Sequence, residues 1–487
     1  MPTRELVVVG AGPAGMAAAI AAAEAGLPVT VVDEGPRTGG QIYRQPPAEF
    51  EKRTVDDGSP DARRGEVLLR RFEELAGNRI EWMGSSTAWG LFPPRRLAVE
   101  RDGAFRMIDT DGLILAPGAY EMVPPFPGWT LPGVMTPGAA QVLAKSMGVV
   151  AGRRIFLAGT GPFLLVVALA LHRAGAEVVG IAETVRFGDV LRAFPGMVAA
   201  PALLRQGWGY LRALSRAGIP VHRGHSIVEA RGGEALEEIS IAPCDADWFP
   251  DRSRTRRIEV DTLCVGYGFV PRTQLAQLAG CHLVYSASLG GWIPHVDDEQ
   301  ATSVDGVWVA GDGGGVAGSW VAELEGRLAG LSAARRAGAL DEASFRSGRR
   351  HIDAELGKLR RFRAALDSAS RIRPGLDALA DGETLVCRCE ELTRSEVDAG
   401  VDMGATDARS LKVVTRLGMG PCQGRMCWPS AVRRLAAQTG RTPEEIGAPS
   451  VRPPIRPVSM ASLAALDGGL TEASPCSTGA VLEEVPP

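Results

Sequence analysis

Residues 5–34 read ELVVVGAGPAGMAAAIAAAEAGLPVTVVDE, and they set the fold of the first part of the chain. The valine-rich run Leu6–Val9 predicts a strand that is buried on both faces. The alanine-rich residues 16–25 predict a helix, because alanine has the highest helix propensity. Val29–Val32 predicts a second strand. A strand, a glycine turn, a helix and a strand in this order predict an α/β domain with a parallel sheet.

The turn of this unit carries glycines in the order G-x-G-x-x-G, at Gly10, Gly12 and Gly15. The first permits a tight turn, the second lets the backbone approach a pyrophosphate, and the third lets the helix pack closely on the strand. Asp33 ends the second strand, 18 positions after Gly15, where a carboxylate accepts hydrogen bonds from a ribose. The pattern predicts a dinucleotide site; a glycine-rich turn in another α/β protein is the alternative.

Three later segments are expected to complete this site. Gly39-Gly40-Gln41 would let the backbone pass close to a flat ligand. Residues 111–119 form an apolar strand that ends in a small-residue turn, with a plain buried strand as the alternative. Residues 306–312 deliver Asp312 to a glycine turn before a helix predicted at 319–337, which suits the sugar-alcohol chain of a flavin better than a simple Asx turn. We therefore expect FAD, bound by Gly10, Gly12, Pro13, Ala14, Gly15, Asp33, Glu34, Gly40, Gln41, Ala116, Gly118, Gly311 and Asp312.

A second strand–turn–helix–strand unit begins at residue 154, with Gly159 and Gly161 in its turn and Glu183 at its end. The position that matches Gly15 is Leu164, whose side chain would hold the helix away from the strand. We expect this 159–183 site to hold a second nucleotide, ATP or NAD(P), less closely; a unit that has lost its ligand is the alternative. Residues 186–217 are predicted to be helical, with a mixed apolar and basic face near the end.

Other segments give less specific signals. Residues 66–76 predict an amphipathic helix, and residues 79–83, 86–92 and 97–101 predict a small β-meander. We place the domain limits at residues 1–125 and 276–345 for the two parts of the FAD domain, 126–275 for the second nucleotide-binding domain, 346–380 for a helical connector, 381–450 for a cysteine domain and 451–487 for a C-terminal tail. From residue 464 on, we expect the tail to be mobile or to wrap on a partner.

Four of the eight cysteines form two close pairs, Cys387 with Cys389 and Cys422 with Cys427. Four thiolates from two loops can hold Zn²⁺ or an iron–sulfur cluster. Zinc favours C-x2-C knuckles, whereas the C-x-C arm suits one iron of a [2Fe–2S] cluster, with the second pair on the other iron. We expect the cluster; zinc and unligated thiols are the alternatives. Groups expected to tune it lie nearby in the sequence: Gly418, Gly420, Gly424, Lys412 and Arg425.

Composition excludes some functions. The 487 residues are 45% hydrophobic and carry a net charge of −4. The chain therefore lacks the excess of positive charge that is typical of proteins that bind nucleic acid. The longest apolar stretch is broken by Gly159, Gly161 and Pro162, so it predicts a buried unit and not a membrane span. The N-terminus does not resemble a signal peptide. We expect a cytoplasmic location.

Together, these motifs resemble the two-dinucleotide-binding-domain flavoproteins of the pyridine nucleotide–disulfide oxidoreductase fold, followed by a domain similar to bacterioferritin-associated ferredoxin. The combination of VVDEGPRTGGQIYR at residues 31–44 with LVCRCEELTRSEV at 385–397 resembles the A (α) subunits of opine oxidases, hydrogen cyanide synthases and proline or hydroxyproline dehydrogenases. The resemblance implies an α/β protein with two Rossmann-like domains and a small α-helical C-terminal [2Fe–2S] domain.

By that resemblance, the chain is an FAD- and [2Fe–2S]-containing subunit of an enzyme that oxidises a C–N bond of an opine (octopine or nopaline type) or a related imino acid. A flavoprotein B subunit would perform the oxidation, a small ferredoxin-like subunit would accompany it, and this chain would relay electrons. Residues 39–47 and 130–200 contain no cysteine, so the dithiol chemistry of disulfide reductases is excluded. No catalytic residue is predicted. The alternatives are an NAD(P)H-dependent flavin reductase that feeds its own cluster, a hydrogen cyanide synthase subunit, and a zinc-containing scaffold without redox chemistry.

Overall fold

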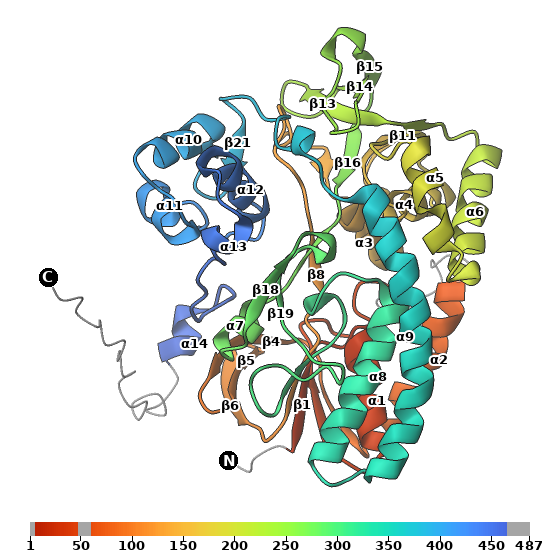
Figure 1. The fold of residues 1–487 in the computed structure, drawn as a ribbon, viewed down its shortest axis with the longest axis vertical. Helices are drawn as coiled ribbons and strands as arrows, with labels where there is room; N and C mark the ends of the chain where they lie inside the picture. The colour runs from red at the N-terminus through yellow and green to blue at the C-terminus, as the bar shows by residue number, and fades with distance from the viewer. Residues whose placement is uncertain (1–4, 47–59, 465–487) are drawn as a thin grey trace, which may run out of the picture.

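The computed structural model describes residues 5–46 and 60–464, and shows two α/β domains with a smaller domain beside them (Figure 1). Residues 465–487 of the predicted C-terminal tail lie outside the described residues. The helix predicted at residues 66–76 is present. That helix, α2 (Pro60–Leu75), begins six residues earlier than predicted.

The first domain is built on a sheet of five parallel strands, as expected from its apolar strands. In spatial order the strands are β20 (Val307–Val309), β7 (Leu113–Leu115), β1 (Leu6–Val9), β2 (Val29–Val32) and β3 (Ile80–Met83). The helices α1 (Pro13–Glu24) and α8 (Ser319–Arg336) cover one face. A β-meander covers the other face, so the domain has three layers.

The meander differs from the prediction in one strand. Its strands are β4 (Ser86–Phe92), β5 (Arg96–Arg101) and β6 (Ala104–Asp109). Residues 79–83, predicted as its first strand, instead form β3 at the edge of the parallel sheet, where Val29 and Ile80 are in register. The prediction was wrong because the partner of a strand depends on distant residues, whereas strand propensity is local.

The second domain repeats this plan. In spatial order its parallel strands are β12 (Val221–Arg223), β11 (Glu177–Glu183), β10 (Arg154–Gly159), β16 (Thr262–Gly266) and β9 (Val134–Met135). The helices α3 (Pro137–Met147), α4 (Phe163–Arg173), α5 (Phe187–Met197) and α6 (Pro201–Arg216) belong to it. An antiparallel pair, β8 (Ala119–Glu121) and β17 (Phe269–Pro271), links the two domains. The two predicted α/β units are therefore confirmed.

The C-terminal part begins with α9 (Glu342–Ser370), which packs along α8 and reaches α5 of the second domain (Figure 1). The small helical domain follows, with the hairpin β21 (Leu385–Cys387) and β22 (Leu392–Thr393) and the helices α10 (Arg394–Asp402), α11 (Ala408–Thr415), α12 (Trp428–Thr439) and α13 (Pro443–Ile446). The predicted domain limits remain predictions.

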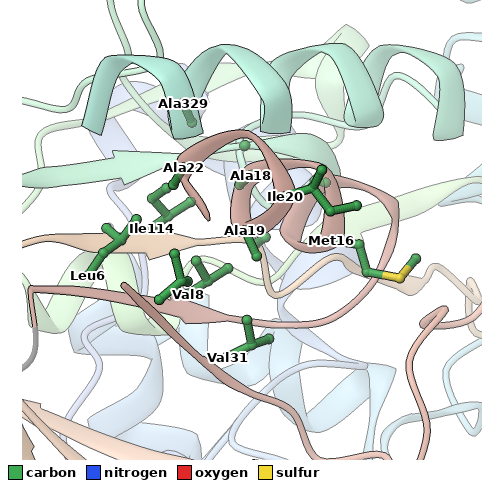
Figure 2. Packing of buried hydrophobic residues seen from close by; sticks show 14 of the residues in the cluster. Leu6, Val8, Met16, Ala18, Ala19, Ile20, Ala22, Val31, Ile114 and Ala329 are labelled. Carbon is green, nitrogen blue, oxygen red and sulfur yellow. The ribbon is translucent and has the colours of Figure 1, made fainter. Parts of the chain in front are cut away.

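The packing of α1 and α8 determines the layout of the first domain. Figure 2 shows α1 between the sheet residues Leu6 and Val8 and Ala329 of α8. The two helices approach closely because α8 carries glycines at the contact: a Cβ on Gly326 would lie 2.0 Å from the Ala14 carbonyl oxygen, and one on Gly330 would lie 2.3 Å from that of Ala18. No larger residue fits at either position without moving a helix.

This contact gives a stability prediction. Gly326→Ala should lower the free energy of unfolding by about 1–3 kcal/mol, because the added methyl group overpacks the α1–α8 contact. The control is Gly357→Ala on α9, where no atom lies within 4 Å of the added Cβ and helix propensity favours alanine by up to about 1 kcal/mol. Thermal unfolding followed by circular dichroism should place Gly326→Ala several degrees below wild type. A Gly326→Ala midpoint at or above that of wild type would contradict this packing role.

Candidate cofactor sites

The first glycine turn has the geometry that the sequence predicts. Gly10 has a φ angle of +103°, and a Cβ on it would lie 2.2 Å from the Ala116 carbonyl oxygen. A Cβ on Gly15 would lie 1.7 Å from the Gly10 carbonyl oxygen, so α1 lies in van der Waals contact with the turn. Pro13 is at the start of α1, where its missing N–H costs nothing. The turn therefore presents a helix N-terminus to a phosphate group.

Asp33 lies directly beside this turn. Its carboxylate accepts hydrogen bonds from the N–H of Ala11 at 2.6 Å and of Gly35 at 2.7 Å. Burial raises the pKa of Asp33, and these two N–H groups oppose that rise. Glu34 is partly exposed and pairs with Arg272 at 3.0 Å and with Arg456. Burial acts to raise the pKa of Glu34, but the guanidinium groups of its partners lower it overall.

The three later segments meet at the same turn. A Cβ on Gly40 would lie 2.8 Å from the Gly12 Cα, and one on Gly311 would lie 2.7 Å from the Ala14 Cβ. Asp312 accepts hydrogen bonds from the N–H groups of Ala317 and Gly318, at 3.0 and 3.2 Å. Segments nearly 300 residues apart in the sequence thus converge on one site.

A buried carboxyl group that the sequence did not reveal lies beside Asp312. Glu325 of α8 accepts a hydrogen bond from the Gly311 N–H at 3.2 Å and pairs with Arg360 of α9 at 3.2 Å. Burial raises the pKa of this carboxyl group to about 7, against the effect of Arg360. Nothing in the sequence marks Glu325, because a single glutamate in a helix is usually a solvated residue.

One cavity of 3660 Å³ connects both nucleotide-binding turns and reaches the C-terminal domain. Most of the predicted cofactor residues line it; Gly15, Gly159 and Gly311 do not. Its volume exceeds the usual range of about 300–1,000 Å³ for a single ligand. Several buried polar atoms of its walls have no hydrogen-bond partner among the described residues: Arg44 Nε, Thr160 Oγ1, Arg272 Nε and Trp292 Nε1. Such atoms fit a cavity that takes polar ligands.

The second turn departs from the first as predicted at Leu164. Gly159 and Gly161 both have positive φ angles, of +149° and +91°. Leu164 is buried in the same hydrophobic cluster as Ile155 and Leu157 of β10, whereas Gly15 brings the backbone of α1 against the Gly10 carbonyl group. The acid at the ribose position, Glu183, already pairs with Arg223 at 3.0 Å. Burial raises the pKa of Glu183, against the effect of Arg223.

The four cysteines lie together between the hairpin β21–β22 and the start of α12. The thiol of Cys387 contacts that of Cys427, and the thiol of Cys389 contacts that of Cys422. These contacts join the hairpin to the loop that precedes α12. The expected division of the four thiols between two irons stays a prediction. Among the described residues, no three His, Cys, Asp or Glu side chains lie close enough together to hold one metal ion.

Backbone groups surround these thiols. The Cys427 thiol and the N–H groups of Glu390 and Gly418 lower the pKa of Cys387 to about 5. The glycines at this site are required by close contacts: a Cβ on Gly420 would lie 2.3 Å from the Cys389 Cβ, and one on Gly424 would lie 1.9 Å from the Trp428 ring.

Two contacts attach the cysteine domain to the rest of the chain. The indole N–H of Trp129 donates to the Leu385 carbonyl at 2.8 Å, just before the first cysteine. Arg433 forms a bidentate pair with Asp377, at 2.8 and 2.9 Å. Such pairs are geometrically specific, so they orient the domain.

A stack of side chains runs from Glu34 to the cysteine loops. The Arg272 guanidinium lies 4.3 Å from the centre of the Tyr120 ring, and the Arg425 guanidinium lies 5.2 Å from it. Arg272 also binds Glu34, and Arg425 stands between Cys422 and Cys427 in the sequence. The sequence indicated only that Arg425 is near the cysteines. Lys412, predicted with it, lines the cavity.

Two joined dinucleotide-binding domains with a cysteine domain define a class of multidomain oxidoreductase. Residues 4–338 match the pyridine nucleotide-disulphide oxidoreductase family, and residues 381–467 match the sarcosine oxidase A3 domain. The chain belongs to the pyridine nucleotide-disulphide oxidoreductase family, in which flavin-type dinucleotides bind.

The similar proteins cover nearly the whole chain. The hydrogen cyanide synthase subunit HcnB of Pseudomonas protegens is 37% identical over 461 residues, 93% of this chain and 96% of its own length. The A subunit of opine oxidase from Agrobacterium tumefaciens is 35% identical over 477 residues, 95% of this chain and 92% of its own. The structure of L-proline dehydrogenase from P. horikoshii has the same fold, with a TM-score of 0.68 and 20% identity over 95% of this chain and 79% of that one.

These matches confirm the resemblance and the fold class inferred from the sequence. They also confirm that the chain is a flavin-dependent oxidoreductase. None of the helices in the described part of the chain is long and apolar enough to cross a membrane.

Glu325 gives a pH prediction with a defined sign. Its pKa is about 7 in the folded chain and 4.5 as an ordinary group, so the folded state retains a proton that the unfolded state releases between these values. Stability should therefore fall as pH rises from 5 to 8. Glu325→Gln keeps an acceptor for Gly311 but cannot ionise. The stability of wild type relative to this variant should fall by about 1–3 kcal/mol over that range.

The measurement is denaturant unfolding at pH 5 and pH 8, with Glu234→Gln as the control at an exposed bend. The control should track wild type at both pH values. The opposite result would be a wild type that gains stability relative to Glu325→Gln as the pH rises. It would contradict the prediction, because it would show that the surroundings stabilise the ionised carboxylate of Glu325.

Proposed function

We propose that this chain is the FAD- and [2Fe–2S]-containing A (α) subunit of a multi-subunit dehydrogenase or oxidase. The complex would oxidise the C–N bond of an opine (octopine or nopaline type) or of a related imino acid such as proline or hydroxyproline. The observation that carries the proposal is a cavity that begins at the flavin-type turn and reaches Gln423, Gly424 and Arg425, in the loop between two of the four clustered cysteines. The relatives support it, because HcnB and its opine oxidase counterpart are both subunits.

The first turn fits FAD. Gly12, Pro13 and Ala14 would receive the pyrophosphate, Asp33 the ribose, and Asp312 the ribityl chain. Gly40, Gln41, Ala116 and Gly118 line the same cavity and would complete the walls of the site. A bound flavin takes up two electrons together and releases them singly. The role of this chain would be to hold and orient the flavin. The N–H groups of Ala11 and Gly35 fix the Asp33 carboxylate. The N–H groups of Ala317 and Gly318 fix that of Asp312.

The four thiols fit a [2Fe–2S] cluster. Each iron of such a cluster takes two thiolates, and the structure presents two thiol pairs. Backbone N–H groups of Glu390 and Gly418 point to Cys387, and hydrogen bonds of this kind tune the potential of a cluster. Cys387, Cys389, Cys422 and Cys427 would together hold the cluster.

The second turn would hold a nucleotide, ATP or NAD(P), in a structural role. Leu164 fills the space that a close-packed helix needs, and Glu183 is already occupied by Arg223. The residues beside the expected flavin ring, Gln41, Tyr43 and Arg44, include no carboxylate that could act as a general base. We therefore assign the oxidation step to a partner flavoprotein B subunit, and electron relay to this chain.

A small ferredoxin-like subunit would be a further member of the complex. A cytoplasmic location is part of the proposal. It is supported by the seven described cysteines, all of which are free thiols, as is usual where the surroundings are reducing.

The cluster can be tested with one variant. The purified wild-type chain should contain iron and inorganic sulfide in equal amounts and show absorption bands beyond those of the flavin. Cys389→Ser should lose the iron, the sulfide and these bands but retain FAD, because the flavin turn lies in another domain. Cys244→Ser, at a half-buried cysteine of the second domain, should retain all of them. One equivalent of zinc without iron in the wild-type chain would overturn the proposal.

A further inference from the structure

The helices α5 and α6 carry an apolar surface that the described chain leaves uncovered. Phe187, Leu191, Phe194 and Val198 follow one another at helical spacing, and the side chains of Phe187 and Leu191 are 73% and 63% exposed. Trp208 of α6 is 71% exposed. We call these five residues the α5–α6 surface. A group of large apolar side chains of this kind on one face usually marks an interaction site.

The opposite face of α5 already forms the core. Ala193 and Met197 of α5 pack with Leu204 of α6 and with Leu366 of α9. An ordinary surface helix is apolar on one side only, so α5 has a second apolar side with no function in the fold of this chain. The exposed residues are therefore not a displaced part of the core.

The exposed charged residues of α5 and α6 are all arginines. Arg192 is exposed, as are Arg205, Arg212 and Arg216 of α6, and α6 contains no acidic residue. The single acid of α5, Asp189, is buried beneath Arg186 and Arg192. This basic rim stands out on a chain with a net charge of −4. A binding partner should present carboxylates opposite it.

The rim argues against a second copy of this chain as the partner. In a symmetric dimer the same surface faces itself, so arginines would lie opposite arginines. The position of the surface argues against a lipid bilayer. Phe187, Leu191, Phe194 and Trp208 also line the large cavity, so the surface is hollowed where a bilayer would be flat.

We propose that the α5–α6 surface docks the flavoprotein B subunit of the complex, through an apolar patch on that protein rimmed with carboxylates. This rests on the proposed function, and it names the place of contact. A protein seated there would close the cavity that the flavin turn and the second turn share. It would thus stand next to the cofactor sites to which it supplies electrons.

The test uses the native complex, purified through an affinity tag on this chain, with Leu191→Glu and Arg212→Glu as variants. Both positions are exposed, so neither variant should prevent folding; an unchanged FAD content checks this. The amount of flavoprotein B subunit per chain, measured by mass spectrometry, should fall about tenfold or more for Leu191→Glu. It should fall less for Arg212→Glu, and that loss should shrink at high salt.

Met403→Glu is the matched control, because Met403 is 70% exposed and lies at the end of α10 in another domain. It should keep the wild-type ratio of subunits. If both α5–α6 variants also keep that ratio, the surface proposal fails and the proposed function stands. If the wild-type chain recovers no flavoprotein partner, both fail.

Two further outcomes would assign the surface to another occupant and overturn the proposal. One is a wild-type homodimer, seen by analytical ultracentrifugation of the purified chain, that Leu191→Glu converts to monomer. The other is binding of the purified chain to phosphatidylglycerol vesicles that Leu191→Glu abolishes.

Discussion

The close approach of Gly15 to the Gly10 carbonyl group positions nearly everything else around the first turn. No side chain fits there, because a Cβ would lie 1.7 Å from that oxygen. The contact seats α1 on the strand turn and aims its first residues into the cavity. Gly326 then lets α8 pack on α1, and α8 in turn holds Asp312 and Glu325 in place. One backbone contact thus positions groups from three distant segments.

The two nucleotide-binding units show what this contact does for function. Where Leu164 takes the place of Gly15 in the second unit, the helix is packed through a buried leucine and the acid is paired with Arg223. In both sheets the first strand of the unit lies between the second strand of the unit and a strand from later in the chain. The first unit is instead connected to the cysteine loops, through the stack of Arg272, Tyr120 and Arg425. The proposed relay of electrons would run along this connection.

Local pattern was enough to predict both units and the cysteine domain, because turn glycines, apolar strands and alanine-rich helices act within a few residues of one another. Features that depend on distant partners could not be predicted. β3 joined the parallel sheet and not the meander. Glu325 and the exposed face of α5 emerged only when neighbouring helices were in place, since burial is a property of the whole fold.

In the proposed complex, electrons from the oxidation performed by the partner reach the cysteine cluster of this chain. Freeze-quench electron paramagnetic resonance of the native complex, mixed without oxygen with its amino-acid substrate, observes that transfer directly. We predict the signal of a reduced [2Fe–2S] cluster within the time of one turnover, and none when NADH replaces the substrate. A cluster that NADH reduces in the isolated chain, or one that stays oxidised while substrate is consumed, would contradict the proposed relay.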